Sequence, residues 1–172
     1  MATATIRPIS DGATLQWILY PDTGEDSYED IDEDRTQPTA GITTDYIQSD
    51  TTNHVTICNL ATIANVGTIT QVSVWVYAKD ADGYGEEGYV SVNPSGSYET
   101  NQTIGVSTIT SYAWYNKVFD GTWAINGTAS IAIRFTCKTG VGSGNGVRVA
   151  TAYAVVTYNE PVTTMLNPVK YW

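Results

Sequence analysis

The chain contains few of the residues on which nucleic-acid-binding and membrane-binding proteins depend. Its 172 residues include eight lysines and arginines against eighteen aspartates and glutamates. The net charge of −10 argues against nucleic acid or an anionic membrane surface as a partner, because both attract positively charged proteins. No apolar run approaches the ~18 residues of a membrane-spanning helix. We therefore expect no nucleic acid and no membrane among its partners.

Catalytic motifs are also missing. The single histidine, His54, has neither a second histidine nor a nucleophile motif near it in the sequence, and we expect it to be structural. The sequence has no G-x-S-x-G, H-E-x-x-H, P-loop or paired-cysteine zinc pattern. These absences predict a protein that is not an enzyme, with no catalytic residues and no cofactor.

The chain has only two cysteines. Its amino terminus lacks the basic and apolar segments of a secretory signal. We therefore expect the protein to be made and folded in a cytoplasm. In that reducing compartment, Cys58 and Cys137 are expected as buried free thiols, with a disulfide between them as the alternative.

Residues that favour β-strands are abundant, and they alternate. In Thr68–Lys79 (TITQVSVWVYAK) three valines and an alanine fall on one face of a strand, with Trp75 and Tyr77 on the other. The valine face predicts a core. The other face is too aromatic for water alone, so we expect it to meet a second layer, the C-terminal tail or a partner.

The rest of the chain continues this pattern. Ala129–Cys137 alternates in the same way, and Val147–Tyr158 is apolar on both faces, as expected of a central strand. Eight to ten strands with almost no helix predict an all-β protein, an antiparallel jelly-roll-like β-sandwich over residues 1–158. We expect turns at Asp120-Gly121 and Asn126-Gly127, one helical turn at Ile63–Gly67 and a short strand at Ser97–Val106.

Acidic residues form two clusters. Eight of the eighteen carboxylates lie between Asp22 and Asp34, which predicts a solvated loop that Tyr28 and Ile31 attach to the body. The second cluster, Asp80, Asp82 and Glu86, has the start of a calcium-loop pattern but not its full register. We expect an ordinary acidic loop there, with Ca²⁺ binding as the alternative.

After Asn159 the character of the sequence changes. Residues 159–172 contain two prolines and several large apolar side chains that water does not favour. We expect an extended C-terminal arm that folds over its own sheet or lies across a neighbouring subunit. Its predicted partner-binding residues are Met165, Leu166, Val169, Tyr171 and Trp172.

A resemblance extends over about Thr5 to Tyr158. The segments that carry it are Thr5-Ile6-Arg7-Pro8, Trp17, Tyr28–Glu33, Thr44–Ile47, Ile69–Val74 and Trp123. In this order of features the chain resembles the jelly-roll domains of minor structural proteins in tailed-phage genomes. The short region Thr108–Ala129 and the tail after Asn159 depart from that pattern.

The resemblance implies a bacteriophage virion component made in the host cytoplasm. Our first hypothesis is a capsid decoration (cement) protein that binds the major capsid protein and neighbouring copies of itself as a homo-oligomer such as a trimer. A tail or fibre module and an extracellular filament subunit are alternatives.

An alternative from a different class is a carbohydrate-binding module. The aromatic group Tyr112, Trp114, Tyr115 and Trp123 offers rings on which sugars stack, with Trp114, Tyr115 and Trp123 as the contact residues. The same residues also suit a core and its rim.

Overall fold

The structure is a computed structural model, and it describes residues 1–20, 28–29, 31–32, 43–140 and 146–161. These residues form eleven strands and no helix, so the described part has no helix that could cross a membrane. The strands are β1 (Ala2–Ile6), β2 (Pro8–Leu15), β3 (Ile18–Tyr20), β4 (Tyr46–Ser49), β5 (Val55–Leu60), β6 (Ile63–Asp80), β7 (Glu87–Asn93), β8 (Gln102–Thr103), β9 (Ala113–Ala129), β10 (Ala132–Thr139) and β11 (Val147–Asn159).

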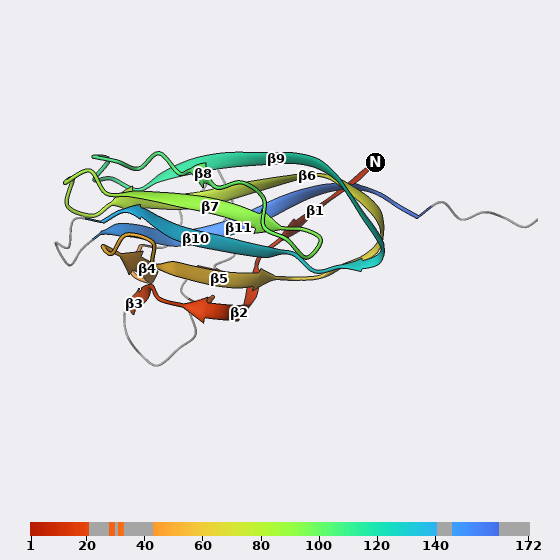
Figure 1. The fold of residues 1–172 in the computed structure, drawn as a ribbon, viewed down its shortest axis with the longest axis horizontal. Helices are drawn as coiled ribbons and strands as arrows, with labels where there is room; N and C mark the ends of the chain where they lie inside the picture. Colours follow the sequence, from red (N-terminus) through yellow and green to blue (C-terminus); the bar gives the residue numbers. More distant parts are fainter. Residues whose placement is uncertain (21–27, 30, 33–42, 141–145, 162–172) are drawn as a thin grey trace, which may run out of the picture.

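The strands form two antiparallel sheets that pack face to face (Figure 1). Sheet A has the order β3-β4-β11-β6-β9, with β1 also paired to β11, and sheet B has the order β2-β5-β10-β7-β8. The strands from β4 onward therefore form two four-stranded halves, β4-β11-β6-β9 and β5-β10-β7-β8. Each half interleaves early and late strands of the chain, which is the arrangement of a jelly roll. The predicted fold class is confirmed.

The core lies between the sheets, and β6 contributes one whole face to it. Val72, Val74, Val76 and Ala78 are all fully buried. From sheet B, Ile133, Phe135 and Cys137 of β10 meet them, as the alternation of Ala129–Cys137 predicts. The thiols of Cys58 and Cys137 are both buried and unbonded, so the expectation of free thiols is confirmed.

The last strand, β11, is central, as predicted from its two apolar faces. On one side it pairs with β6; on its other side β4 pairs with one end and β1 with the other.

The acidic segment is attached to the body at two points. In the part of β11 between its pairings with β4 and β1, the backbone N–H of Ala152 donates to the carbonyl of Ile31 at 3.0 Å, and the Ile31 side chain is fully buried. The N–H of Tyr28 donates to Oδ1 of Asp11. The two predicted attachment points of the acidic segment are confirmed.

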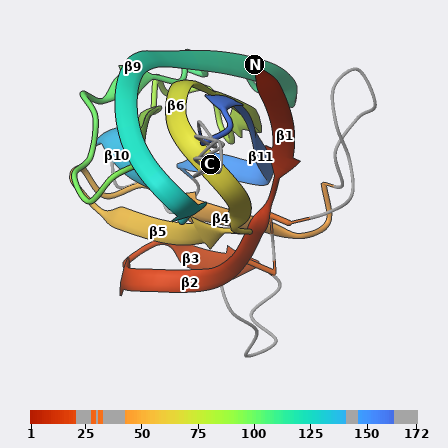
Figure 2. The ribbon, with the colours of Figure 1, turned by 90° about the vertical axis from the view of Figure 1, so that its right-hand side faces the viewer.

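Two predicted turns and a predicted helical turn are wrong. Asp120-Gly121 and Asn126-Gly127 both lie inside β9, and Ile63–Gly67 is the start of β6. The pairing of these two strands shifts register at several positions, and Asn65 and Asn126 adopt positive φ. The glycine and asparagine residues therefore allow irregular, bent pairing rather than chain reversal. Figure 2 shows the resulting curvature of β9.

One predicted strand also differs from expectation, and the path of one connection is decided by the structure. The strand predicted over Ser97–Val106 is reduced to the two residues of β8. The sequence is compatible with either a hairpin or a crossing connection after Lys79. In the structure the acidic connection after β6 leaves sheet A and enters sheet B at β7, so it crosses between the layers. The jelly-roll order requires this crossing, which alternation along single strands does not reveal.

The predicted arm lies almost entirely outside the described residues. β11 ends at Asn159, one residue into the predicted arm, and Glu160 and Pro161 follow it exposed. Met165, Leu166, Val169, Tyr171 and Trp172 are not among the residues that the structure describes.

Candidate functional site

The outer face of sheet A carries a group of aromatic side chains, here called the aromatic face. It comprises Trp75, Tyr77, Tyr112, Trp114 and Tyr153. Strand pairing brings them together: Trp75 lies opposite Tyr153 on β11, and Tyr77 lies opposite Trp114 on β9. Because alternate residues of β6 point to opposite faces, the valines that fill the core place the two aromatic residues outside.

The five rings form one continuous network. Trp75 and Tyr153 are nearly parallel at 6.3 Å between ring centroids, and Trp114 meets Tyr153 edge-on at 5.6 Å. Tyr77 lies 5.0 Å from Trp114 and 5.3 Å from Tyr112. Such ring pairs contribute about 0.5–1.5 kcal/mol each beyond their burial, so the network is held in place before any ligand arrives.

The aromatic face is half-open. Tyr153 forms its base with 4% of its surface exposed, while the other four side chains are half-buried. The hydroxyl of Tyr112 is buried and has no hydrogen-bond partner. Burial, ahead of the opposing effect of the Arg148 charge, raises the pKa of this hydroxyl, so it is a neutral donor. A buried donor without an acceptor costs about 1–3 kcal/mol.

Polar groups border the aromatic face. Lys79 and Arg148 lie opposite each other on β6 and β11, and Nε of Arg148 donates to Oε1 of Gln48 at 3.1 Å. On the other side, Nδ2 of Asn116 donates to Oγ of Ser73 at 2.7 Å. A broad apolar surface with polar groups at its edge suits a ligand that has both apolar faces and hydroxyl groups.

The structure divides the four aromatic residues predicted as one sugar platform. Tyr112 and Trp114 belong to the aromatic face, but Tyr115 lies opposite Val76 and therefore on the other face of β9. Trp123 packs against the core, and its Nε1 donates to Glu99 at 2.9 Å. The sequence-based prediction grouped residues that are close in the sequence, although alternation along β9 places them on opposite faces. It also missed Tyr153, which joins the aromatic face only through the pairing of β11 with β6.

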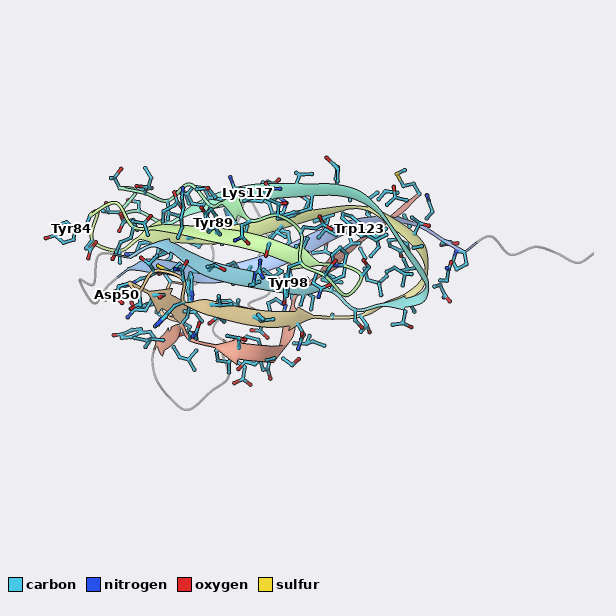
Figure 3. All side chains as sticks on the ribbon, viewed as in Figure 1. Asp50, Tyr84, Tyr89, Tyr98, Lys117 and Trp123 are labelled. Atoms are coloured by element: carbon cyan, nitrogen blue, oxygen red, sulfur yellow. The ribbon has the colours of Figure 1, made fainter. Side chains whose placement is uncertain are left out.

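The outer face of sheet B offers a contrast. There Arg134 lies 4.3 Å from the ring centroid of Tyr98, and Lys138 lies 5.4 Å from that of Tyr89. Figure 3 labels both tyrosines. Each ring meets one cation, and the structure gives these two rings no aromatic partner among the described residues. The two pairs provide matched controls for the aromatic face.

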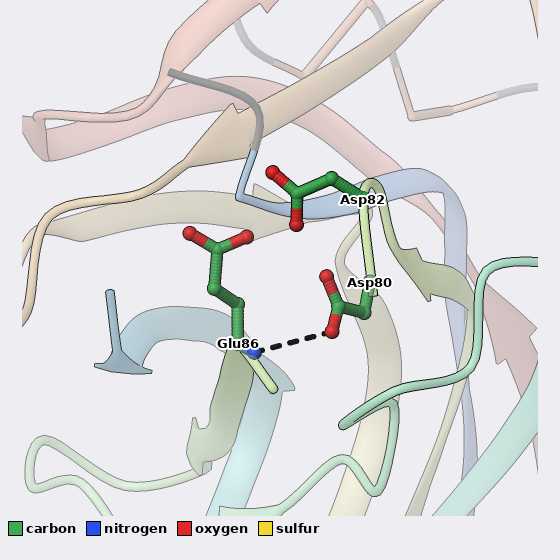
Figure 4. A group of neighbouring side chains, drawn as sticks. All are labelled: Asp80, Asp82 and Glu86. Atoms are coloured by element: carbon green, nitrogen blue, oxygen red, sulfur yellow. Dashed lines mark hydrogen bonds between the residues drawn. The ribbon is translucent and has the colours of Figure 1, made fainter. Parts of the chain in front are cut away.

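A second candidate site lies in the connection between β6 and β7. The carboxylates of Asp80, Asp82 and Glu86 converge, with one oxygen from each within 4.8 Å of the others (Figure 4). Asp80 and Glu86 are fully buried, and Oε2 of Glu86 has no hydrogen-bond partner. The three residues of the alternative prediction, Ca²⁺ binding, are therefore brought together.

Asp80 also has a structural role that the sequence did not indicate. Its Oδ2 accepts hydrogen bonds from the backbone N–H groups of Gly85, Glu86 and Thr108 at 2.9, 3.2 and 3.0 Å. Its Oδ1 accepts another from Gly83. These four backbone donors satisfy both oxygens of the buried carboxylate without a metal. The predicted acidic loop is thus organised around Asp80, whether or not a cation binds beside it.

The oxygen donors fit a hard cation such as Ca²⁺, which tolerates irregular sets of carboxylate ligands better than Mg²⁺ does. Asp82 is half-buried, and its Oδ1 accepts the N–H of Tyr84. The carbonyl of His54 accepts hydrogen bonds from Nε1 of Trp17 and the N–H of Cys137, so the backbone of this residue has a structural role.

No protein-family model and no curated protein matches the chain. Several solved structures have a similar backbone. One is the CBM36-1 domain of a multidomain xylanase from the hindgut metagenome of Trinervitermes trinervoides. The two sequences are 7% identical, the alignment covers 93% of this chain and 100% of that one, and the TM-score is 0.49. A CBM35 from Cellvibrio japonicus Abf62 has 10% identity, coverage of 92% and 95%, and a TM-score of 0.46. A family 35 carbohydrate binding module from Clostridium thermocellum has 13% identity, coverage of 92% and 100%, and a TM-score of 0.46. Similarity of this extent concerns the fold alone, and function must be inferred from the residues of this chain.

Proposed function

We propose that this protein is a non-catalytic glycan-binding domain that holds a polysaccharide against the aromatic face of sheet A. The observation that carries the proposal is the network of five contacting rings from three neighbouring segments, placed on the outside of the sandwich.

The chemistry of the aromatic face suits sugars. A pyranose ring presents apolar C–H groups on its faces and hydroxyl groups around its edge. Aromatic rings cover the C–H groups, and polar side chains at the border of the surface receive or donate hydrogen bonds. Gln48 and Asn116 border the rings with amides.

A core function explains the aromatic face less well. The core of this sandwich is already filled between the sheets by residues such as Phe135 and Ile133. Trp75, Tyr77 and Trp114 lie on the opposite surface of sheet A, where a protein that binds nothing has no need for three large rings.

Affinity electrophoresis and tryptophan fluorescence with a panel of soluble polysaccharides test the proposal. We expect one or more polymers to retard the protein and to change its fluorescence. Trp114→Ala should weaken binding by roughly tenfold or more, as expected when a central interface aromatic is truncated. Tyr98→Ala, on sheet B, should bind like the wild type. Equal binding by Trp114→Ala and the wild type, or no response to any polymer, would contradict the proposal.

A further inference from the structure

We propose that the glycan is a linear, uncharged polysaccharide and that an internal stretch of about four sugars lies along β6, from the aromatic face to Gln71 and Asp120. This inference rests on the proposed function and adds the class of substrate and the direction in which it binds. The residues that carry it lie beside the rings, on the outer face of sheet A.

The aromatic face continues into a group of polar side chains, here called the polar strip: Gln71, Ser73, Asn116 and Asp120. Gln71 and Ser73 lie on the same face of β6 as Trp75, because the buried valines alternate with them. Strand pairing places Asp120 opposite Gln71 and Asn116 opposite Trp75. The aromatic face and the polar strip therefore form one surface that follows a single strand.

Two hydrogen bonds hold the polar strip in place. Nδ2 of Asn116 donates to Oγ of Ser73 at 2.7 Å, and Nε2 of Gln71 donates to Oδ1 of Asp120 at 2.8 Å. Each pair keeps further capacity for hydrogen bonds: the carbonyl oxygens of the amides, the second oxygen of the carboxylate and the proton of the serine hydroxyl. Sugar hydroxyls both donate and accept, so they match this mixture of groups.

The polar strip is accessible to a ligand. Asp120 is exposed, and Val118, which lies between Asn116 and Asp120 on the same face of β9, is 40% exposed. On the other side, β1 adds the exposed hydroxyls of Thr3 and Thr5 through its pairing with β11. These exposed side chains show that no described segment crosses the polar strip. An open surface accommodates the interior of a polymer, whereas an enclosed pocket would select its end.

The direction along β6 gives the longer contact. Between Tyr77 and Gln71 the strand advances six residues, about 20 Å, which is the length of about four linked pyranose rings. Across the strands, the rings extend only over β11, β6 and the beginning of β9, a width of about 10 Å. On the far side of β11, the bond from Ala152 to Ile31 places the acidic segment beside this level of the sheet. A glycan that crossed the strands would leave the rings after about two sugars.

The two parts of the surface have different tasks. The aromatic face covers the C–H faces of the first sugars, and the polar strip forms hydrogen bonds with the hydroxyl groups of the next ones. The polar strip contains the carboxylate of Asp120 and no cation, and the chain has a net charge of −10, so an acidic polymer would be repelled there. A disaccharide fills only the aromatic face, while a tetrasaccharide also reaches the polar strip.

The experiment measures affinity against chain length by isothermal titration calorimetry. The probes are cello-, xylo- and manno-oligosaccharides of one to six sugars, with hydroxyethyl cellulose, xylan and glucomannan as the polymers. For at least one series, we expect the tetrasaccharide to bind about tenfold more tightly than the disaccharide, with a further gain of at most about threefold at six sugars. Reduction of the terminal sugar of the hexasaccharide to its alditol should leave the affinity unchanged.

Matched variants locate the length dependence. Gln71→Ala and Asp120→Ala should each lose most of the tenfold gain while keeping the affinity of the wild type for the disaccharide. Trp114→Ala should weaken binding at every length. The control is Asn101→Ala, which removes an exposed amide that accepts a hydrogen bond from Arg134 on sheet B, and it should bind like the wild type. Thermal melting of each variant verifies its fold.

The outcomes separate the two proposals. Equal affinity at all lengths, or loss of binding when the terminal sugar is reduced, indicates a site for a chain end; either result overturns the internal stretch and leaves glycan binding standing. The length dependence of the wild type in both Gln71→Ala and Asp120→Ala overturns the direction along β6. Binding of a charged or branched polysaccharide, but of none of these probes, overturns the substrate class. Binding of no polysaccharide at all contradicts both proposals.

Discussion

Oε1 of Glu87, at the start of β7, accepts a hydrogen bond from the backbone N–H of Gly105, 2.9 Å away and 18 residues later in the chain. The same oxygen accepts from Gly88 and Val106 at 2.9 and 3.2 Å. With Asp80, which accepts from Thr108, this buried carboxylate fastens the segment after β8 to the connection between the sheets. Two side chains thus replace the strand pairing that this segment lacks.

Glu87→Gln should destabilise the protein. The amide keeps one acceptor oxygen, but its NH₂ group would face backbone donors, so at least one buried N–H loses its partner. Hydrogen bonds to charged groups contribute about 1.5–3 kcal/mol, and we expect a loss of about 2 kcal/mol in the free energy of unfolding, measured with urea. Glu99→Gln, a change in a half-buried residue that contacts Trp123, is the control and should cost less. A free energy unchanged in Glu87→Gln would show that the carboxylate does not organise the loop.

Tyr112→Phe should have the opposite effect. The substitution removes a buried hydroxyl that has no partner and keeps the ring that contacts Tyr77 and Lys79. We expect the free energy of unfolding to rise by about 1 kcal/mol. Tyr84→Phe, in which the hydroxyl belongs to a side chain that is 72% exposed, should change nothing. Destabilisation of Tyr112→Phe would mean that the hydroxyl is already satisfied in the free protein.

The acidic cluster predicts a response to Ca²⁺. We expect millimolar Ca²⁺ to raise the melting temperature more than Mg²⁺ does, because the three carboxylates repel one another and a cation relieves them. Asp82→Asn keeps an acceptor for the N–H of Tyr84 but removes one charge. It should raise the melting temperature in EDTA and abolish the gain from Ca²⁺. The cluster is only a structural loop if Ca²⁺ and Mg²⁺ act alike on the wild type.

The two thiols should be inert in the folded protein. Burial raises the pKa of both, and that of Cys137 rises from 9.0 to about 11. At pH 8 its thiolate fraction is then about one hundredth of that in the unfolded chain. We expect a disulfide reagent to modify neither cysteine natively and both in guanidinium.

The pH dependence of stability has a defined sign. The folded state holds the Cys137 proton more tightly than the unfolded state does, so this group stabilises the fold fully below about pH 9. Its contribution should be lost as the pH rises from about 9 to about 11. Comparison of urea unfolding at pH 8 and pH 10 with that of Cys137→Ala isolates it. An identical pH dependence in the variant would contradict the assignment.

The virion hypothesis, which remains a proposal, assigns the contact between neighbouring copies to the C-terminal arm. Deletion of residues 162–172 removes Met165, Leu166, Val169, Tyr171 and Trp172 but leaves β11, which ends at Asn159. We expect the melting temperature to stay the same and self-association, measured by light scattering, to be lost. Unchanged association of the truncated protein would exclude the arm as the contact between copies.

The sequence was informative where period-two alternation acts within one strand. It predicted the core face of β6, the central place of β11 and the two attachment points Tyr28 and Ile31. Sequence analysis failed where the same residue types are compatible with two different backbone structures. The pair Asn126-Gly127 is typical of a tight turn, but positive φ also allows an irregular strand, and the long partner strand β6 decides between the two.

The candidate site shows the same limit. Trp75 and Tyr77 were identified from one strand, but Tyr153 joins them only through pairing between β6 and β11, 78 residues away in the case of Trp75. The acidic cluster was visible because its members lie within seven residues. The hydrogen bond from the backbone N–H of Thr108 to Asp80 could not be predicted, because no periodic sequence pattern indicates that a carboxylate will accept hydrogen bonds from the backbone.

The pairing of β1 with β11 places Ala2 opposite Tyr158. Residues opposed in an antiparallel ladder are about 5 Å apart, so the polypeptide begins and finishes its folded body at nearly the same point. A domain of this kind can be inserted into a surface loop of another protein without separating the two residues that flank the insertion site. The folded body can also be circularly permuted by a short linker from Tyr158 to Ala2, with new termini at an exposed turn such as Ser95-Gly96.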